Sequence, residues 1–400
     1  MIRHLFTLMW NRKRANSLLM LEVLLAFVVL FAVSSLGVSL WGNYRTPLGF
    51  AYQQVWAIDI STPGLAGRAP RTEALQRIGQ HLRATPGVLC VTRHAGNTPF
   101  ANANNTGDVS TGTGPDRRVV EPVNYLDTGP ELRELLGLHM QEGRWFDRRD
   151  EAANYRPVVI TTDLRDALFA PGQSPLGQTI QGPKDWHETW RVVGVSGPYR
   201  PDGALHEPVP GVFLYASAQD TVHALNGLLV RVAPGAGAVL EKKITDDIRT
   251  LGAGWRGTIN TLDEQRLSQL KVNLSLPVIL GVVCLFLIVN VMLGLFGVLW
   301  LNINQRRAEL GVRRALGATA AAVSRQVLGE ILVLTTFGLV LGLLIAAQFP
   351  LLGVFNVKAS VYLTAMAIAA AGLYLLAAGC ALYPSRLAAG IQPAVALREE

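Results

Sequence analysis

The sequence predicts an α-helical membrane protein with four transmembrane helices and a large α+β extracytoplasmic domain between the first and second helices. Three observations lead to this fold class. Half of the 400 residues are hydrophobic and only 16% are charged, which is unusual for a soluble globular protein. Four apolar stretches each reach the roughly 20 residues that a helix needs to cross a bilayer. The long stretch between the first two of them has the mixed composition of a folded soluble domain.

We divide the chain at the ends of the apolar stretches. The four predicted transmembrane helices are residues 17–40, 276–301, 327–348 and 360–383. The other segments are an interfacial N-terminal helix at 1–16, the α+β domain at 41–275, a loop at 302–326 and a tail at 384–400.

The basic residues predict the orientation. Twelve basic and five acidic residues lie outside 41–275, and their difference accounts for the whole formal charge of +7. Every one of these basic residues except Lys358 falls in the N-terminal segment, the 302–326 loop or the C-terminal tail. By the positive-inside rule these three segments are cytoplasmic, so the domain at 41–275 lies outside the cytoplasm. The positive charge therefore reflects membrane topology and does not indicate nucleic acid binding.

The first apolar stretch has two interpretations. Its basic start and its small residues at Ala32 and Ser34 are also typical of a cleavable signal peptide. Its length, and Glu22 near its start, favour an uncleaved anchor with both termini in the cytoplasm. Either interpretation places residues 41–275 outside the cytoplasm.

Within 41–275, strand-like and helix-like patterns alternate. A strand at 54–60, an amphipathic helix at 72–84 and a strand at 88–92 predict a β-α-β unit. Residues 96–116 are rich in Gly, Asn, Thr and Pro, which predicts a loop or turn-rich insert. We expect a porter-like β-α-β part, an inserted subdomain at about 97–200, a helix at 238–251 and a helical stalk at 261–275.

Three residues in the spans are candidates for helix packing. Gly338 and Gly342 have the G-x-x-x-G spacing that lets two helices approach closely, although the same spacing also occurs on lipid-facing surfaces. Asn290 lies near the middle of the second span, where an amide is costly unless it faces protein. We therefore expect Asn290 to face another helix.

The sequence contains no recognisable catalytic or metal-binding motif. The nearest approach to a P-loop, at 177–184, lacks the Gly-Lys-Ser/Thr ending. The histidines of 41–275 are scattered rather than set at ligand spacing. We therefore expect no catalytic residues, no metal site and no cofactor bound directly by this chain.

The loop at 302–326 carries the most informative pattern. Its apolar residues Ala308, Val312 and Ala315 keep helical spacing, and Glu309 and Arg313 form a favourable i,i+4 pair. Arginines that only set topology would explain the charge of this loop but not its helical period.

The end of the helical pattern is also defined. Gly317 suits a helix C-terminus, and Thr319 can cap the helix that runs into the third span. A helix held at the inner membrane surface, charged on one side and apolar on the other, is suited to docking a cytoplasmic partner.

Several stretches resemble the MacB/FtsX-type ABC transporter permeases. Residues 305–318 (QRRAELGVRRALGA) resemble the cytoplasmic loop signature of that family, with Leu310 and Val312 in place of the usual isoleucines. Residues 384–398 (PSRLAAGIQPAVALR) resemble its C-terminal motif. Weaker similarities to the MacB-type periplasmic domain lie at 137–146 (GLHMQEGRWF), 175–180 (PLGQTI) and 192–195 (VVGV).

The resemblance implies a permease subunit without a nucleotide site, working with a separate ABC ATPase that uses ATP and Mg²⁺. The loop would be a coupling helix on that ATPase, and ATP-driven motion would reach the periplasmic domain by mechanotransmission. The implied coupling residues are Arg306, Arg307, Ala308, Glu309, Leu310, Gly311, Val312, Arg313, Arg314, Ala315, Leu316 and Gly317.

The resemblance also implies location and partners. We expect a multi-pass protein of the bacterial inner membrane, in contact with membrane lipids and paired with a second permease, either identical or related. A periplasmic adaptor is a further expected partner, and the substrate would be an antibiotic, peptide, lipid or lipoprotein.

Two other functions are considered. An FtsX-like regulator would activate a periplasmic cell-wall hydrolase instead of transporting a substrate. An anchored periplasmic enzyme is disfavoured because no catalytic constellation is visible in the sequence.

Overall fold

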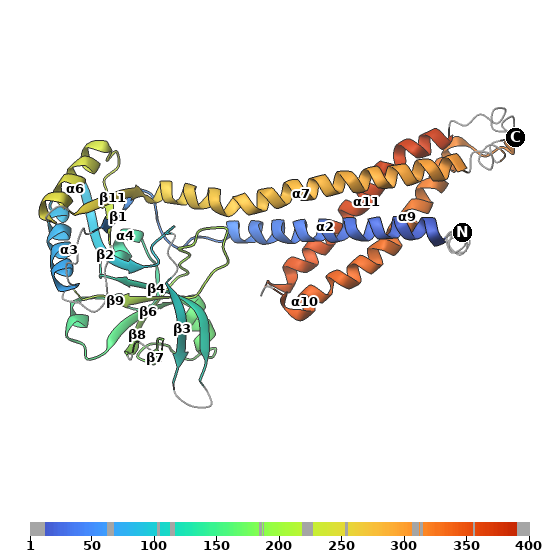
Figure 1. The fold of residues 1–400 in the computed structure, drawn as a ribbon. Coiled ribbons are helices and arrows are strands. Elements are labelled where there is room, and N and C mark those ends of the chain that lie inside the picture. The colour runs from blue at the N-terminus through green and yellow to red at the C-terminus, as the bar shows by residue number, and fades with distance from the viewer. Residues whose placement is uncertain are drawn as a thin grey trace. The chain divides into compact units, whose positions relative to one another are not determined.

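The computed structural model describes residues 13–61, 68–101, 105–112, 117–183, 186, 188–217, 227–252, 255–305, 312, 315–354 and 357–389 (Figure 1). The chain divides into two compact units. One is formed by Met1–Gly42 together with Leu274–Glu400, and the other by Asn43–Asn273.

Four helices of the described residues are long and apolar enough to cross a membrane. They are α2 (Lys13–Arg45), α7 (Leu262–Gln305), α9 (Ala320–Ala346), which is followed by the short α10 (Gln348–Leu352), and α11 (Ala359–Ala389). The predicted fold class is confirmed, with one such helix before the α+β domain and three after it. The predicted stalk at 261–275 and the second span form one continuous helix, α7, which runs through Pro277.

The helices of the first unit pack around aromatic and small residues. Phe27 of α2 is fully buried and stacks on Phe31, which also contacts Phe349 and Tyr362. Helices α9 and α11 pack on each other and share a hydroxyl contact of 2.9 Å between Thr336 and Tyr374. In contrast, only 6% of the residues in the most apolar stretch of α7 are buried in the single chain, whereas 33% are buried in the corresponding stretches of α9 and α11.

Among its described residues, the second unit contains one connected sheet of eleven strands with helices packed on it. Its helices are α3 (Arg68–Arg83), α4 (Leu132–Leu136), α5 (Thr162–Leu168) and α6 (Ala238–Leu251), and a 3₁₀ turn, η1, spans Arg148–Ala152. Its strands are β1 (Val55–Ser61), β2 (Val88–Gly96), β3 (Thr106–Thr111), β4 (Val119–Thr128), β5 (Met140–Gly143), β6 (Arg156–Thr161), β7 (Thr179–Gln181), β8 (Thr189–Ser196), β9 (Gly211–Tyr215), β10 (Gly227–Val232) and β11 (Arg256–Thr261).

The first part of this sheet has the order β11-β1-β10-β2. Because side chains alternate along a strand, Trp56 and Ile58 of β1 face one side and Val55 and Ala57 face the other. Helices α3 and α6 cover the first side, and α4 covers the second. Strand β10 lies between β1 and β2, so the predicted β-α-β unit is split by a strand from far along the chain.

The second part of the sheet closes on itself. Strand β4 pairs with β3, β3 with β7, β7 with β8, β8 with β6, β6 with β9, and β9 with β4 again. The core of this barrel includes the fully buried Trp190, Ile160 and Leu214. The ring extends to Tyr215 of β9, beyond the expected end of the insert near residue 200.

The 96–116 segment differs from its expected loop structure. It contains the last residue of β2 and all of β3, in which Val109 and Ser110 are buried in the barrel. The sequence of β3, TGDVST, lacks alternating hydrophobic residues, so this strand is stabilised by its neighbours β4 and β7 rather than by its own pattern.

Candidate coupling site and its supporting contacts

The described end of the 302–326 loop exposes two apolar side chains. Val312 is 43% exposed and Leu316 is 82% exposed, and the Leu316 N–H donates to the Val312 carbonyl at 3.0 Å, as in a helix. Of the predicted coupling residues, the structure describes these two, Ala315 and Gly317. The others lie outside the described residues: Arg306, Arg307, Ala308, Glu309, Leu310, Gly311, Arg313 and Arg314.

The turn after this segment has the geometry that its sequence favours. Gly317 has φ +97°, a left-handed conformation in which a side chain would be strained. Thr319 then caps α9, because its hydroxyl accepts from the Ala322 N–H at 3.2 Å.

The base of the loop is held by packing between α7 and α9. Ile303, near the end of α7, and Val323, in the first turn of α9, are both buried and form one cluster with Ala318 and Val327. Because these residues lie on either side of the loop, its two ends are fixed against each other.

Gly338 and Gly342 lie where α9 approaches α2. A Cβ atom on Gly338 would fall 2.5 Å from Cγ1 of Val23, and one on Gly342 would fall 2.4 Å from Cδ1 of Phe27. Both distances are shorter than side chains tolerate, so glycine permits this approach.

Asn290 is exposed in the single chain, and its Nδ2 donates to the Phe286 carbonyl one turn earlier in α7 at 2.8 Å.

A contact between α2 and α7 was not anticipated from the sequence. A Cβ on Gly294 of α7 would fall 2.1 Å from Oε1 of Glu22 in α2. Gly294 therefore makes room for the Glu22 carboxyl group. The sequence could not predict this contact, because Glu22 and Gly294 lie in different spans and no motif links them.

The three weak sequence similarities of the α+β domain meet at one place in the barrel. Gly143 has φ +68°, and a Cβ there would lie 2.5 Å from the Val193 carbonyl oxygen and 2.7 Å from Leu176. A Cβ on Gly194 would lie 2.2 Å from the Arg144 carbonyl oxygen. The residues of these stretches thus pack against one another, which indicates a structural role.

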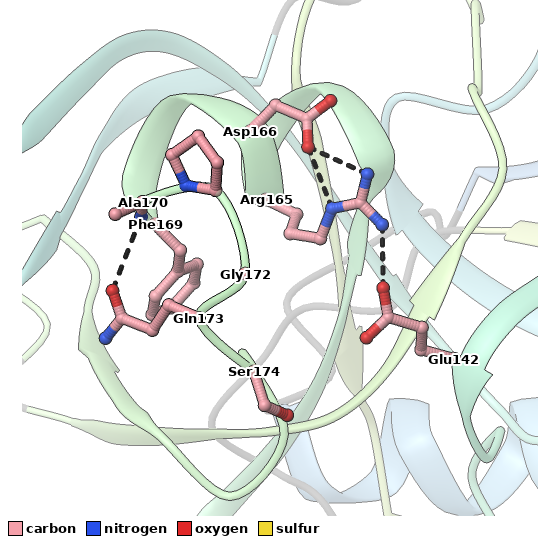
Figure 2. Close-up of a pocket in the computed structure, with 9 residues that line it drawn as sticks. Glu142, Arg165, Asp166, Phe169, Ala170, Gly172, Gln173 and Ser174 are labelled. Atoms are coloured by element: carbon pink, nitrogen blue, oxygen red, sulfur yellow. Dashed lines mark hydrogen bonds and ion pairs between the residues drawn. The ribbon is translucent and has the colours of Figure 1, made fainter.

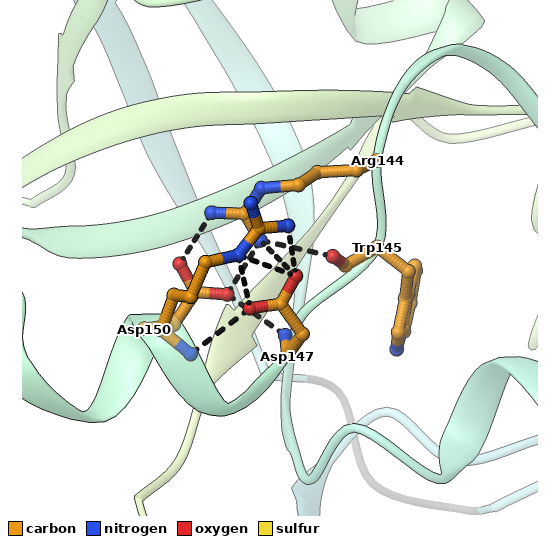
Figure 3. A network of polar contacts seen from close by, with 5 residues as sticks. Arg144, Trp145, Asp147 and Asp150 are labelled. Carbon is orange, nitrogen blue, oxygen red and sulfur yellow. Dashed lines mark hydrogen bonds and ion pairs between the residues drawn. The ribbon is translucent and has the colours of Figure 1, made fainter.

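Arg144 holds the turn that follows (Figure 3). Its guanidinium makes two contacts of 2.7 Å with the buried Asp150 and lies 3.4 Å from Asp147. Asp147 also accepts from the side chain and the backbone N–H of Arg149, which holds the pKa of the Asp147 carboxyl well below its usual range. Each charged group of this network is thus paired with another member of the network, and these pairs hold the 3₁₀ turn η1.

A surface pocket of about 450 Å³ lies beside α5 (Figure 2). Arg165 lies between Glu142 at 2.7 Å and Asp166 at 2.8 Å, and the Gln173 side chain accepts from the Ala170 N–H at 3.3 Å. The guanidinium is thus neutralised by two carboxylates. Both carboxylates of the pocket are paired with Arg165, and the Ser174 hydroxyl accepts from the Leu176 N–H at 3.4 Å. In the part of the chain that is described, no group of three or more His, Cys, Asp or Glu side chains could hold a metal ion.

The fold and these contacts define a multi-pass membrane protein with a periplasmic-type α+β domain between its first two spans. Residues 17–246 match the MacB-like periplasmic core domain, and residues 281–393 match the FtsX-like permease C-terminal domain. The chain therefore belongs to the MacB/FtsX-type family of ABC permeases. Permeases of this family pair with ABC ATPases.

The similar proteins are distant. The macrolide export ATP-binding/permease protein MacB of Sodalis glossinidius is 25% identical over 298 residues, covering 70% of this chain and 44% of that relative. MacB 1/2 of Paracoccus denitrificans is 27% identical over 227 residues, covering 56% of this chain and 33% of that relative. The chain thus spans less than half the length of either relative. The crystallised periplasmic region of MacB from Actinobacillus actinomycetemcomitans is 18% identical, covers 57% of this chain and 97% of that chain, and has a TM-score of 0.38.

Proposed function

We propose that this chain is the permease subunit of an ABC transporter that exports a substrate such as an antibiotic, peptide, lipid or lipoprotein. A separate ABC ATPase subunit binds ATP and Mg²⁺ and docks on the 302–319 segment. The observation that carries this proposal is the exposed pair Val312 and Leu316 on a segment whose ends are fixed by Ile303 and Val323. An exposed apolar pair beside arginines suits a protein interface, in which an apolar centre is surrounded by polar contacts.

The proposed route from the ATPase to the periplasmic domain is α7. This helix is continuous from Leu262, which is buried in the core of the α+β domain, to Gln305, which lies within the 302–319 segment. Its first turn is closed by a capping box, in which Thr261 and Glu264 exchange two contacts of 3.1 Å. A displacement of the cytoplasmic end of α7 would therefore act on the periplasmic domain without a break in the helix.

We propose that a second permease covers α7 in the membrane. Asn290 and most of the apolar residues of α7 are exposed in the single chain. An amide inside a bilayer is costly unless it meets another polar group, so Asn290 favours a helix partner over lipid. The same pairing would place two ATPase docking segments side by side, as an ATPase dimer requires.

The proposed location is the bacterial inner membrane with both termini in the cytoplasm, as the distribution of basic residues predicts. A reporter domain fused after Gly254 tests this orientation. We expect activity from a periplasmic reporter, alkaline phosphatase. Activity of a cytoplasmic reporter at this position would overturn the orientation.

The proposed function is tested by affinity purification of the full chain from its native membranes. We expect an ABC ATPase in stoichiometric amount, together with a periplasmic adaptor if the complex exports its substrate. Recovery of a cell-wall hydrolase in place of the adaptor would support the FtsX-like regulatory function instead. Recovery of the chain without any ATPase would contradict both.

A further inference from the structure

Arg200 is a buried cation in the 198–206 loop that follows β8. It is 3% exposed, and the carboxylate of Asp163 acts on it electrostatically. Its guanidinium donates to four backbone carbonyls: those of Asn43 at 2.9 Å, Thr46 at 2.8 Å, Ala204 at 3.2 Å and His206 at 2.5 Å. Its Nε is buried without a hydrogen-bond partner among the described residues, so burying this guanidinium is costly and calls for a reason.

The carbonyls of Asn43 and Thr46 supply that reason. Asn43 lies in the last turn of α2 and Thr46 directly follows the helix, where carbonyls lack the usual i+4 partner and carry the negative end of the helix dipole. The Asn43 carbonyl accepts from the Thr46 N–H at 3.2 Å as well as from Arg200. Arg200 therefore caps α2 from a position more than 150 residues away in the sequence. Desolvation lowers the pKa of Arg200 from its ordinary value, but the group stays protonated at neutral pH.

The chain that leaves α2 lies along the same loop. The Arg200 N–H donates to the Leu48 carbonyl at 3.1 Å, and Nδ2 of Asn43 donates to the Leu205 carbonyl at 3.2 Å. Gly49 has φ +85°, and a Cβ on it would fall 1.7 Å from the Pro198 carbonyl oxygen. Residues 43–49 and 198–206 are thus joined by several independent contacts.

The other helix that enters this domain, α7, reaches the same place. A Cβ on Gly203 would lie 2.8 Å from Oε1 of Gln269, so the 198–206 loop closely approaches α7. Arg266 of α7 donates to the Tyr52 hydroxyl at 2.9 Å and lies 4.8 Å from the centre of the Tyr52 ring.

A strained residue joins the loop to the rest of the domain. Phe100 has φ +60°, which is rare for a bulky side chain, and its N–H donates to the Pro201 carbonyl at 2.7 Å. Its ring packs against Phe50 and Tyr52. The Tyr199 hydroxyl donates to the Asn97 carbonyl at 2.9 Å. The loop therefore contacts the ends of both helices and the core of the domain.

We propose that Arg200 is a positioning residue that anchors the end of α2 to the 198–206 loop, next to the attachment of α7, so that displacements of both helices reach the α+β domain. The anchor follows from the contacts alone. Its part in coupling rests on the proposed function.

The anchor is tested on the full chain in lipid nanodiscs, without any partner, by hydrogen exchange. Arg200→Met keeps the length of the side chain and removes its donors. We expect about tenfold faster exchange of the amides in 43–50 and 198–206, and a smaller effect for Arg200→Lys, since an ammonium can still reach some of the carbonyls. Arg149→Met is the matched control, because Arg149 is 76% exposed and lies far along the chain from both segments. Unchanged exchange in 43–50 for Arg200→Met would overturn the anchor.

The coupling role is tested in the complex with the ATPase. In the wild type we expect bound ATP to change the exchange of the barrel strands. In Arg200→Met we expect this response to be lost, with ATPase binding and hydrolysis retained, and we expect Arg200→Lys to restore part of it. A residue that only stabilised the domain would change exchange equally with and without ATP.

Two safeguards keep the outcomes distinct. If Arg200→Met does not fold, Asn43→Ala removes one contact of the anchor and should accelerate exchange in 198–206 by a smaller factor. If no ATPase binds the wild type, the proposed function fails while the partner-free experiment still decides the anchor. A full ATP response in Arg200→Met would overturn the coupling role.

Discussion

His94 of β2 shows how burial alone can couple stability to pH. It is 5% exposed, and neither ring nitrogen has a hydrogen-bond partner among the described residues. Its Nε2 faces Gly227, where a Cβ would fall 2.6 Å away. Desolvation lowers the pKa of His94 to about 4, so the folded protein holds this ring neutral at physiological pH.

The sign of the pH effect follows from this shift. Between the ordinary histidine pKa of about 6.5 and the folded value of about 4, the unfolded chain binds more protons than the folded chain. Stability is therefore unaffected by His94 above about pH 6.5 and falls as the pH drops towards 4. We expect His94 to account for a loss of about 3 kcal/mol in the free energy of unfolding between pH 7 and pH 4.

Thermal unfolding of the full chain in detergent, followed by tryptophan fluorescence at several pH values, measures this effect. His94→Leu should flatten the dependence, whereas His139→Leu, at an exposed histidine, should leave it as in the wild type. Parallel curves for the wild type and His94→Leu would show that this histidine does not control the acid sensitivity.

The structural role of a single residue was predictable from the sequence only where neighbouring residues determine that role. Gly317 and Thr319 took their expected places because a helix end and a helix start have local signatures. His94, Arg200 and Glu22 could not be selected, because their burial depends on partners far away in the chain. A lone polar residue looks the same in sequence whether it is solvated or buried.

At the scale of the helices, the approach of α9 to α2 depends on two glycines. Gly342→Leu would drive a side chain into Phe27, which is fully buried, so we expect a destabilisation of about 1–3 kcal/mol. Thermal unfolding in detergent measures it, as a lower midpoint. Gly329→Leu is the control in the same helix, because a Cβ there meets nothing within 4 Å. Equal midpoints for the two variants would mean that this approach does not stabilise the protein.

Strong periodicity made whole elements predictable. The helix expected at 238–251 is α6, Ala238–Leu251, whose buried Ile244 and Ile248 lie one turn apart. Strand β3 was missed because its residues carry no hydrophobic alternation and are ordered by pairing with β4 and β7.

At the scale of the whole chain, hydropathy was enough to predict four spans and one large domain. The closure of the barrel was not predictable, because it depends on the parallel pairing of β4 with β9, which places Leu126 beside Phe213. Such a pairing joins segments almost ninety residues apart and leaves no local trace.

For the whole molecule, the proposed docking of an ABC ATPase on the 302–319 segment is the step on which the function depends. Two of its apolar residues, Val312 and Leu316, are exposed, while Glu309 and Leu310 lie outside the described residues. A charge reversal at Glu309 and a charge at Leu310 would disrupt both the polar and the apolar part of the proposed interface.

The most direct test is co-purification of the ATPase with the tagged full chain carrying Glu309→Arg and Leu310→Glu together. Val239→Glu, at an 87% exposed site in the α+β domain, serves as the control for adding a charge. We expect the double variant to reach the membrane in normal amount but to lose the ATPase by more than about tenfold, with the control unchanged. Unchanged co-purification, with unchanged stimulation of ATP hydrolysis, would contradict the docking role of this segment.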